Sequence, residues 1–436
     1  MVRTDDPSTR SAWAGDTDSK ARIVVHDFSG HPFQAELARS LAHRGHDVLH
    51  VHCTSYTSGK GAFESDASGG SITYSEISVG PAFSRYRLLR RIVQELRYGR
   101  RFTKVAGGFR PDVIISCNDP LIAKAIFAVW ATLHRVAWVF WLQDLYSIAL
   151  TNAALKRSKL LAPLGALMRA IERKLLRSCE GVVSITEDFE PVLADWGVDP
   201  DKCTVIENWA PLGEVVPRPR ECSWREEHGI GDRFLYLYAG TLGLKHNPDV
   251  LHALAAKQDT AVVVVVSEGL GAERLKVMLD EHPLDNLILL PFQPWELVSD
   301  VLGAADVLLV LLQADAGVFS VPSKILTSLC AGRPILAAIP ASNLGARTIV
   351  RAEAGIVVGP GEDASMLEAA ELLRADDALR HRMGVNARAY AEATFDIEPI
   401  TDRFMAVIDQ AAGTHTVAAA PVAILRPDDE RARPGL

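Results

Sequence analysis

The sequence predicts an α/β fold made of two Rossmann-like, doubly wound domains that face each other across a deep cleft. The chain has 436 residues, too many for one core, because single cores stop growing near ~250–300 residues. Short, continuously apolar runs alternate with stretches of helical periodicity, as expected for parallel sheets buried on both faces. A charged, proline-rich passage at residues 211–231 interrupts this alternation once and indicates a linker.

The first domain is expected at residues 21–210, where strands and helices alternate with short connections. Strands are expected at residues 22–27, 47–52, 72–77, 113–116, 136–142, 181–186 and 203–207. Helices are expected at residues 32–44, 85–105, 120–133 and 159–177, and one more helix ends at Trp196.

The second domain is expected at residues 232–395 and repeats the same alternation. Its strands are expected at residues 234–239, 261–266, 287–291, 307–312 and 334–338. Its helices are expected at residues 248–256, 272–281, 295–302 and 323–330, and between residues 364 and 393. The terminal segments, residues 1–20 and 414–436, lack apolar periodicity, so we expect both to be disordered.

Composition argues against several classes of protein. The 46 basic and 54 acidic residues give a net charge of −8, which argues against a general nucleic-acid binder. The six cysteines lie far apart, without the paired spacing of a zinc knuckle or a disulfide framework. The polar N-terminus is not a signal peptide, and no uninterrupted apolar run reaches the ~20 residues of a membrane span. We therefore expect a soluble, cytoplasmic protein with no bound metal.

The strongest local motif is residues 317–334, where a strand is followed by a short loop and a helix. Ser320 is expected near the helix cap and Pro322 in the first turn, where proline costs nothing because that N–H lacks an intrahelical partner. Free N–H groups and a lysine at such a helix start favour a phosphate, although a capped helix that merely packs on the sheet is the alternative. The groups that would face the anion belong to Val321, Ser323 and Lys324.

Three further loops follow strands of the second domain. Gly240 and Gly243 would let the backbone approach a ligand closely, and Lys245 could neutralise a phosphate. Gly269 follows a strand of five valines, and Gln293 follows the next strand, where its backbone groups could meet the edge of a base. Each of these loops could equally be a plain turn between a strand and a helix.

Polar residues also end three strands of the first domain. Gly30 and His31 follow the first strand, Asn118 follows the fourth, and Gln143 and Asp144 follow the fifth. Ligands of doubly wound sheets bind outside the carboxyl ends of the strands, so these residues should face the cleft. Asp144 is a candidate for an essential carboxylate, although aspartate is also a common turn residue.

Several stretches together resemble one family of proteins. They are residues 37–48, 141–146, 205–209, 238–243, 304–307 and 321–334. In these motifs the chain is similar to the retaining, nucleotide-sugar-dependent glycosyltransferases of family 4, which have the GT-B architecture. The likeness covers about residues 21–411, and it is strongest to the branches used in capsule, exopolysaccharide and O-antigen assembly.

The resemblance implies that the second domain binds an NDP-sugar donor, UDP- or GDP-linked, and that the first binds the acceptor. The acceptor would be a lipid-linked saccharide or a small-molecule natural product. Transfer would retain the anomeric configuration without a metal or other cofactor, and a helix at residues 396–413 would return to the first domain. The implied catalytic residues are Asp144, Lys245 and Lys324. The donor site would contain Gly240, Thr241, Gly243, Gly269, Gln293, Phe319, Ser320, Val321, Ser323 and Thr327, and the acceptor side Gly30, His31, Asn118 and Gln143.

The sequence departs from the family pattern in two respects. Phe319 and Thr327 stand where many relatives carry a pair of glutamates, the second of which binds the ribose. Threonine cannot grip a ribose diol as a carboxylate does. Thr241 stands where several relatives place an arginine, and Gln143 where many place a histidine. Donor binding should therefore depend more heavily on the two lysines.

The predicted helix at residues 85–105 is basic and amphipathic. Residues 81–110 contain nine arginines and lysines and one acidic residue, Glu95. Such a helix suits peripheral contact with an anionic inner membrane face or a lipid-phosphate acceptor. The alternative is a solvated helix whose apolar stripe packs on the sheet. The stripe consists of Leu89, Ile92, Val93 and Leu96.

Two other functions stay open on the sequence alone. Sugar-nucleotide epimerases share the GT-B layout, although the cleft loops lack a histidine and carboxylate set of their kind. The missing glutamates also leave room for a non-catalytic protein that binds sugar nucleotides.

Overall fold

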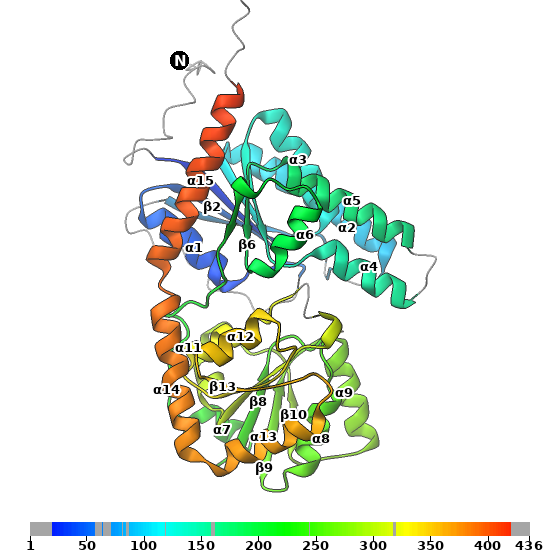
Figure 1. The fold of residues 1–436 in the computed structure, drawn as a ribbon, viewed down its shortest axis with the longest axis vertical. Helices are drawn as coiled ribbons and strands as arrows, with labels where there is room; N and C mark the ends of the chain where they lie inside the picture. Colours follow the sequence, from blue (N-terminus) through cyan, green and yellow to red (C-terminus); the bar gives the residue numbers. More distant parts are fainter. Residues whose placement is uncertain are drawn as a thin grey trace, which may run out of the picture.

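The structure, a computed structural model, describes residues 20–56, 63, 71–80, 82–83, 87–117, 119–157, 162–243, 245–316 and 320–419. Within these residues the chain forms two α/β domains, one above the other in the view of Figure 1. The predicted fold class is confirmed. Residues 1–19 and 420–436, which belong to the segments expected to be disordered, lie outside the described residues.

The first domain contains a parallel sheet in the order β3-β2-β1-β4-β5-β6-β7. Its strands are β1 (Arg22–Asp27), β2 (Asp47–Cys53), β3 (Ser71–Ile77), β4 (Val113–Cys117), β5 (Ala137–Leu142), β6 (Gly181–Ser184) and β7 (Cys203–Val205). Its helices are α1 (Pro32–His43), α2 (Leu88–Phe109), α3 (Leu121–His134), α4 (Tyr146–Arg157), α5 (Ala162–Ser178) and α6 (Glu190–Asp195). Strands β4 and β5 are buried along their whole length, which explains why they are continuously apolar in sequence.

The second domain contains a parallel sheet in the order β10-β9-β8-β11-β12-β13. Its strands are β8 (Phe234–Ala239), β9 (Ala261–Val266), β10 (Leu287–Leu290), β11 (Val307–Leu311), β12 (Ile335–Ala338) and β13 (Gly355–Val358). Its helices are α7 (Ser223–Glu227), α8 (Asp249–Lys257), α9 (Leu270–Glu281), α10 (Val298–Gly303), α11 (Lys324–Cys330), α12 (Leu344–Arg351), α13 (Asp363–Ala375) and α14 (Asp377–Thr394).

In both sheets the order in which strands are added along the chain reverses in the middle. Neighbouring strands β1 and β4 mark the reversal in the first sheet, and β8 and β11 mark it in the second. The loops that leave such a pair run to opposite faces of the sheet and leave a crevice between them. Each domain therefore has a crevice at the carboxyl ends of its strands.

The chain crosses between the domains twice. After the linker leads into the second domain, helix α15 (Ile397–Ala419) returns to the first and contacts α1, β5 and β6 (Figure 1). The Thr401 hydroxyl donates to the Ser40 hydroxyl at 2.9 Å, and the Arg44 guanidinium pairs with two acidic side chains of α15. The helix continues to Ala419, so residues 414–419 are helical rather than disordered.

Four elements were not expected from the sequence: α4, α7, α12 and β13. Helix α7 lies inside the passage predicted as a linker. Strand β13 is a half-buried edge strand of four residues, and α12 has eight residues. Elements as short as α7, α12 and β13 contain too few turns or alternations for their periodicity to stand out, whereas α4 has twelve residues and its length does not explain why it was missed.

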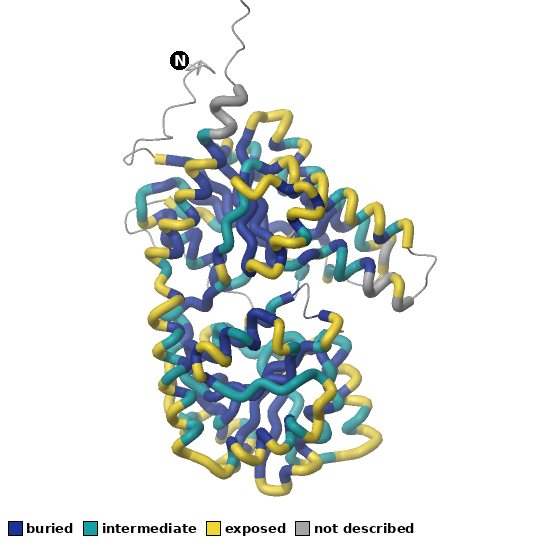
Figure 2. The backbone as a smooth tube through the Cα atoms, viewed as in Figure 1, coloured by how far each residue is buried: buried dark blue, intermediate teal, exposed yellow. Residues whose placement is uncertain are grey.

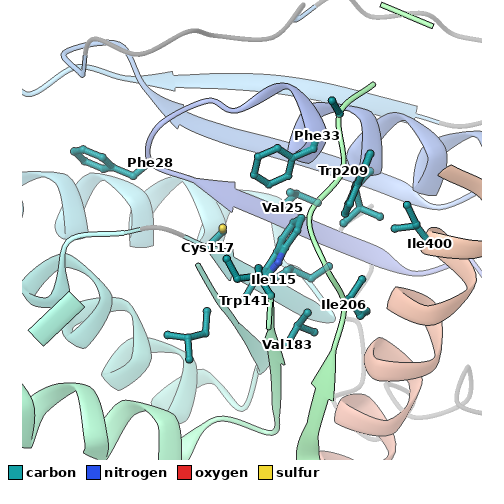
Figure 3. Packing of buried hydrophobic residues seen from close by; sticks show 14 of the residues in the cluster. Val25, Phe28, Phe33, Ile115, Cys117, Trp141, Val183, Ile206, Trp209 and Ile400 are labelled. Atoms are coloured by element: carbon teal, nitrogen blue, oxygen red, sulfur yellow. The ribbon is translucent and has the colours of Figure 1, made fainter. Parts of the chain in front are cut away.

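The core follows the two sheets, whose strands form the buried centre of each domain in Figure 2. An aromatic group joins the first sheet to the segment that precedes the linker and to α15 (Figure 3). Trp141 at the end of β5 stacks on Trp209, just before the linker, with ring centroids 5.8 Å apart. Phe404 of α15 meets the Trp141 ring edge-on at 4.6 Å. Phe33 closes the group from α1.

We expect Phe404→Ala to destabilise the first domain by about 3–5 kcal/mol, because it empties a fully buried ring site between two tryptophans. Urea unfolding followed by tryptophan fluorescence measures this loss. Leu372→Ala on α13, where the side chain is 51% exposed, serves as the control. Equal unfolding midpoints for the two variants would show that α15 does not stabilise the first domain.

Candidate functional site

A cavity of about 980 Å³ lies between the carboxyl ends of the two sheets. Loops from both domains line it, so the crevices of the two sheets form one cleft. It contains most of the residues predicted from the sequence. These are His31, Gln143, Asp144, Gly240, Thr241, Gly243, Lys245, Gln293, Ser320, Val321, Ser323, Lys324 and Thr327.

Two lysines of the second domain converge on this cavity. The Lys324 ammonium donates to the hydroxyl of Tyr238 and lies 3.9 Å from the centre of its ring. The Lys245 ammonium donates to the hydroxyl of the buried Ser320 at 2.5 Å. Both ammonium groups thus have neutral partners, and among the described residues neither forms an ion pair with a carboxylate. Their positive charge is available to an anion in the cleft.

The electrostatics of this side follow from burial and from the two like charges. Burial, together with the neighbouring Lys245, lowers the pKa of Lys324 to about 7. Burial and both lysines also lower the pKa of His246 to about 2, so its imidazole is neutral. The Gly243 N–H donates to Nδ1 of that imidazole at 2.9 Å, which fixes the loop next to the lysines.

The start of α11 differs from the sequence prediction. The helix begins at Lys324, so Ser320, Val321 and Pro322 precede it rather than forming its cap and first turn. Ser323 precedes the helix without a side-chain capping bond. The lysine side chain, more than a helix start, therefore gives this loop its positive charge.

Two glycines shape the same side in different ways. Gly240 has φ +126°, and a Cβ there would lie 3.2 Å from Cε of Lys324, so only glycine leaves this lysine its place. Gly269 is not among the cavity residues; its backbone packs against the carbonyl of Leu242. Gly269 therefore supports the Gly240–Gly243 loop without lining the cavity itself.

The first domain contributes a buried aspartate that sequence analysis missed. Asp27, the last residue of β1, accepts the backbone N–H of Ser29 at 3.0 Å and that of His31. Its carboxylate lies 3.5 Å from Nδ1 of His31. Burial opposes both charges, but their mutual attraction prevails, so the pKa of Asp27 is lowered and that of His31 is raised. Gly30, between the two cavity residues Ser29 and His31, forms the turn at φ +75°.

Gln143 and Asp144 reach the cavity from the end of β5. The Gln143 amide nitrogen donates to the side-chain oxygen of Asn208 at 3.0 Å, and the Asn208 amide returns a second bond. This pair ties the acceptor side to the segment that precedes the linker. Asp144 adds a negative charge near His31 and contributes to the raised pKa of that imidazole.

A polar cluster at the linker holds two tryptophans, Trp209 and Trp295, that line the cavity. The Trp209 indole N–H donates to Glu36 at 2.6 Å, and the Trp295 indole N–H donates to Glu214 at 2.6 Å. Glu214 also pairs with Arg39 of α1. Burial raises the pKa of Glu36 to about 7 despite this hydrogen bond. Sequence analysis missed this cluster because the residues that form it come from three separate segments of the chain.

The remaining predicted residues divide into two groups. Gln293 lines the cavity, and its side-chain oxygen accepts the Trp224 indole N–H at 3.4 Å. The Thr327 hydroxyl donates to the Lys324 carbonyl at 3.1 Å, on the cavity side of α11. Asn118 and Phe319 lie outside the described residues.

Two features are absent from the described part of the chain. It contains no cluster of three or more His, Cys, Asp or Glu side chains arranged to hold a metal ion. In the same residues no helix has the length and apolar character needed to span a membrane.

Comparison with known proteins connects this geometry to a family. Residues 31–209 match the family model of the glycosyl transferase 4-like domain, and residues 221–390 match that of the glycosyl transferases group 1. A curated relative, "Probable glycosyltransferase WbjE" of Pseudomonas aeruginosa, is 26% identical over 269 residues. That match covers 59% of this chain and 65% of the relative.

Two solved structures share the fold at 16% identity. The match to sucrose-phosphate synthase from Thermosynechococcus elongatus has a TM-score of 0.72 and covers 91% of this chain and 100% of the synthase chain. Anabaena HepE in complex with UDP-glucose has a TM-score of 0.65, with 89% and 99% covered. From the two family models, which together span most of residues 31–390, the chain belongs to the family 4-type glycosyltransferases with the GT-B fold.

Proposed function

We propose that this protein transfers a sugar from an NDP-sugar to an acceptor hydroxyl and retains the configuration at the anomeric carbon. The observation that carries the proposal is the pair Lys245 and Lys324 in the cleft, held by neutral partners. Two ammonium groups that converge on one cavity repel each other, and a diphosphate between them would remove that repulsion.

The donor would lie along the second domain. Its diphosphate would contact the two lysines and Ser323, and its base would lie toward Gln293 at the end of β10. Thr327 can offer the ribose its hydroxyl oxygen as an acceptor, because the hydroxyl proton is donated to the Lys324 carbonyl. The complex of HepE with UDP-glucose makes UDP the first nucleotide to test.

The proposed chemistry is electrostatic. The bond between the anomeric carbon and the phosphate oxygen breaks, and the acceptor oxygen bonds to the same face of that carbon. The acceptor proton passes to the departing phosphate oxygen. The two lysines would stabilise the negative charge that grows on the diphosphate, and Asp144 would stabilise the positive charge on the sugar. No metal is assigned a role.

The experiment that tests this function separates binding from turnover. A thermal-shift panel of UDP, GDP, dTDP and ADP identifies the nucleotide, and the matching sugar donors are then incubated with saccharide acceptors and the product linkage is determined. Lys324→Ala should weaken nucleotide binding by about ten- to a hundredfold, the effect of losing a charge-assisted hydrogen bond. Asp144→Asn should preserve binding but lower kcat by about a hundredfold or more.

Lys276→Ala on α9, an exposed lysine away from the cavity, is the matched control and should change neither quantity. An epimer formed from donor alone would contradict sugar transfer. Binding without turnover, whatever acceptor is offered, would contradict enzymatic activity. A product with inverted anomeric configuration would contradict only the retaining stereochemistry and would leave the proposed sugar transfer in place.

We expect nucleotide binding to weaken as pH rises above 7. The pKa of Lys324 is lowered to about 7, so at higher pH a growing share of the free protein carries a neutral amine there. Binding of the diphosphate must then take up a proton, and Kd should rise by up to about tenfold per pH unit. Calorimetry from pH 7 to 9 in two buffers measures both the slope and the proton uptake.

Lys324→Ala provides the control for this slope. Terminal phosphates are almost fully ionised above pH 7, since their second pKa is near ~6, so the variant should bind weakly with no further pH dependence. A flat profile in the unsubstituted protein would mean that Lys324 does not titrate at the diphosphate.

We further propose that the first domain approaches an anionic membrane through α2. Leu89 and Val93 are 81% and 46% exposed, so the apolar stripe does not pack fully on the sheet. Exposed Arg97 and Arg100 continue the same side of the helix. Helix α3 packs against both α2 and α5. On α5 a second hollow is lined by Arg169, Arg173, Lys174 and Arg177.

We expect the protein to sediment at low salt with vesicles of phosphatidylglycerol and phosphatidylethanolamine, because apolar and basic side chains share one exposed face. The double substitution Arg97→Glu and Arg100→Glu should reduce the bound fraction severalfold, while Arg382→Glu on the exposed face of α14 should not. Failure to sediment, or equal loss with Arg382→Glu, would favour a soluble small-molecule acceptor.

A further inference from the structure

Helix α12 of the second domain touches both the donor loop and the first domain. It lies on the side of the second domain that faces the first (Figure 1). None of its residues lines the cavity. The residue that caps its start and a residue one turn later nevertheless make two polar contacts, one within the second domain and one with the first domain.

The first contact joins α12 to the donor loop. Asn343 caps the helix, because its side-chain oxygen accepts the Gly345 N–H at 2.9 Å. The amide nitrogen of the same side chain donates to the carbonyl of Ser320 at 2.9 Å. Asn343 and Ser320 are each 2% exposed, so water cannot replace this bond. One buried side chain thus fixes both the helix and the loop.

The packing around this bond is equally close. A Cβ on Gly345 would lie 2.5 Å from the end of the Ile325 side chain and 3.3 Å from Pro322. The first turn of α12 therefore lies directly on the segment that carries Ser320 and Lys324. The Ser320 hydroxyl accepts the Lys245 ammonium, so the loop held by Asn343 also positions that lysine.

The second contact joins α12 to the first domain. One turn after the cap, the Arg347 guanidinium forms two bonds, of 3.1 and 2.9 Å, with the carboxylate of Asp188. Asp188 lies shortly after β6 and accepts the Thr186 hydroxyl at 3.0 Å. Ile185, next to Thr186, lines the cavity. The ion pair therefore joins the two domains at the rim of the cleft.

We propose that Asn343 is a positioning residue for the donor loop, and that α12 couples this loop to the observed arrangement of the domains through Arg347 and Asp188. The proposal rests on the proposed function, because it assigns the loop to the diphosphate. A diphosphate that orders Ser320 and the lysines would also order α12, and so favour the arrangement in which Arg347 meets Asp188. Thermodynamic reciprocity then requires that the ion pair strengthen nucleotide binding.

The test is a double-mutant cycle on the Kd for UDP, or for whichever nucleotide of the UDP, GDP, dTDP and ADP panel binds. Asn343→Asp keeps the cap, since aspartate caps as well as asparagine, but has no N–H for the Ser320 carbonyl. We expect its Kd to rise roughly tenfold, because a buried carbonyl loses its partner. Asn343→Ser also keeps a cap but introduces no negative charge. It therefore separates loss of the bond to the Ser320 carbonyl from charge repulsion, and it should raise Kd as well.

Arg347→Ala should raise Kd about two- to fivefold, the range of an exposed ion pair. Combined with Asn343→Asp, it should cause no further rise, because the helix no longer transmits the contact. The swap Arg347→Asp with Asp188→Arg should restore binding, and high salt should abolish the effect of Arg347→Ala. Arg274→Ala removes an exposed ion pair within the second domain and is the matched control.

Two results would overturn the inference: unchanged Kd in both Asn343 variants, or fully additive effects of Asn343→Asp and Arg347→Ala. Thermal unfolding of each variant shows whether the fold is kept. Failure of the proposed function gives a different pattern, since Lys324→Ala would then leave nucleotide binding unchanged. If Lys324→Ala weakens binding and the Asn343 variants do not, only the role of α12 is wrong.

Discussion

The site depends on one electrostatic constraint, the presence of two lysine side chains near each other in a cleft where neither of them forms an ion pair with a carboxylate of the described residues. Their repulsion and their burial both disfavour charge, and the pKa of Lys324 falls accordingly. The fold tolerates this because each ammonium has an oriented neutral partner, the hydroxyl of Tyr238 or of Ser320. Other features serve the same arrangement. Gly240 leaves the space that Lys324 occupies, and His246 stays neutral beside the lysines.

The sheets were predictable because their strands are buried on both faces. Strands β1 and β9 begin and end at the residues that the apolar runs predict. The start of α11 was not predictable in this way, since the backbone of Ser320 bonds to Asn343, a residue far along the chain, instead of opening the helix. Helix α12 offered a weak signal in Asn343, a favoured cap residue before a short amphipathic stretch. Eight residues were too few for periodicity to reveal it.

The same distinction applies to the site. Lys245, Lys324, Gln143 and Asp144 follow strands, so the rule that ligands bind at strand ends is enough to predict that they face the cleft, where all four line the cavity. Tyr238 lies inside a strand and would be read as core. Its role depends on Lys324, which approaches from 86 residues away. Residue type and position therefore identify groups that face the cleft, whereas the partners that hold those groups require the tertiary structure.

The contacts between the domains are of two kinds, and the difference suits a cleft that must open. Beside the linker, α15, which continues from the second domain, is fixed to the first domain by buried aromatic contacts of Phe404 with Trp141 and Trp209. Separating these surfaces would cost several kcal/mol, as for other large core side chains. At the rim the pair of Arg347 and Asp188 is more than a third exposed on each side, and such pairs contribute only about 0–1 kcal/mol. The linker side can therefore act as a fixed pivot while the rim separates at little cost, which would admit a donor and release the nucleotide without disturbing either core.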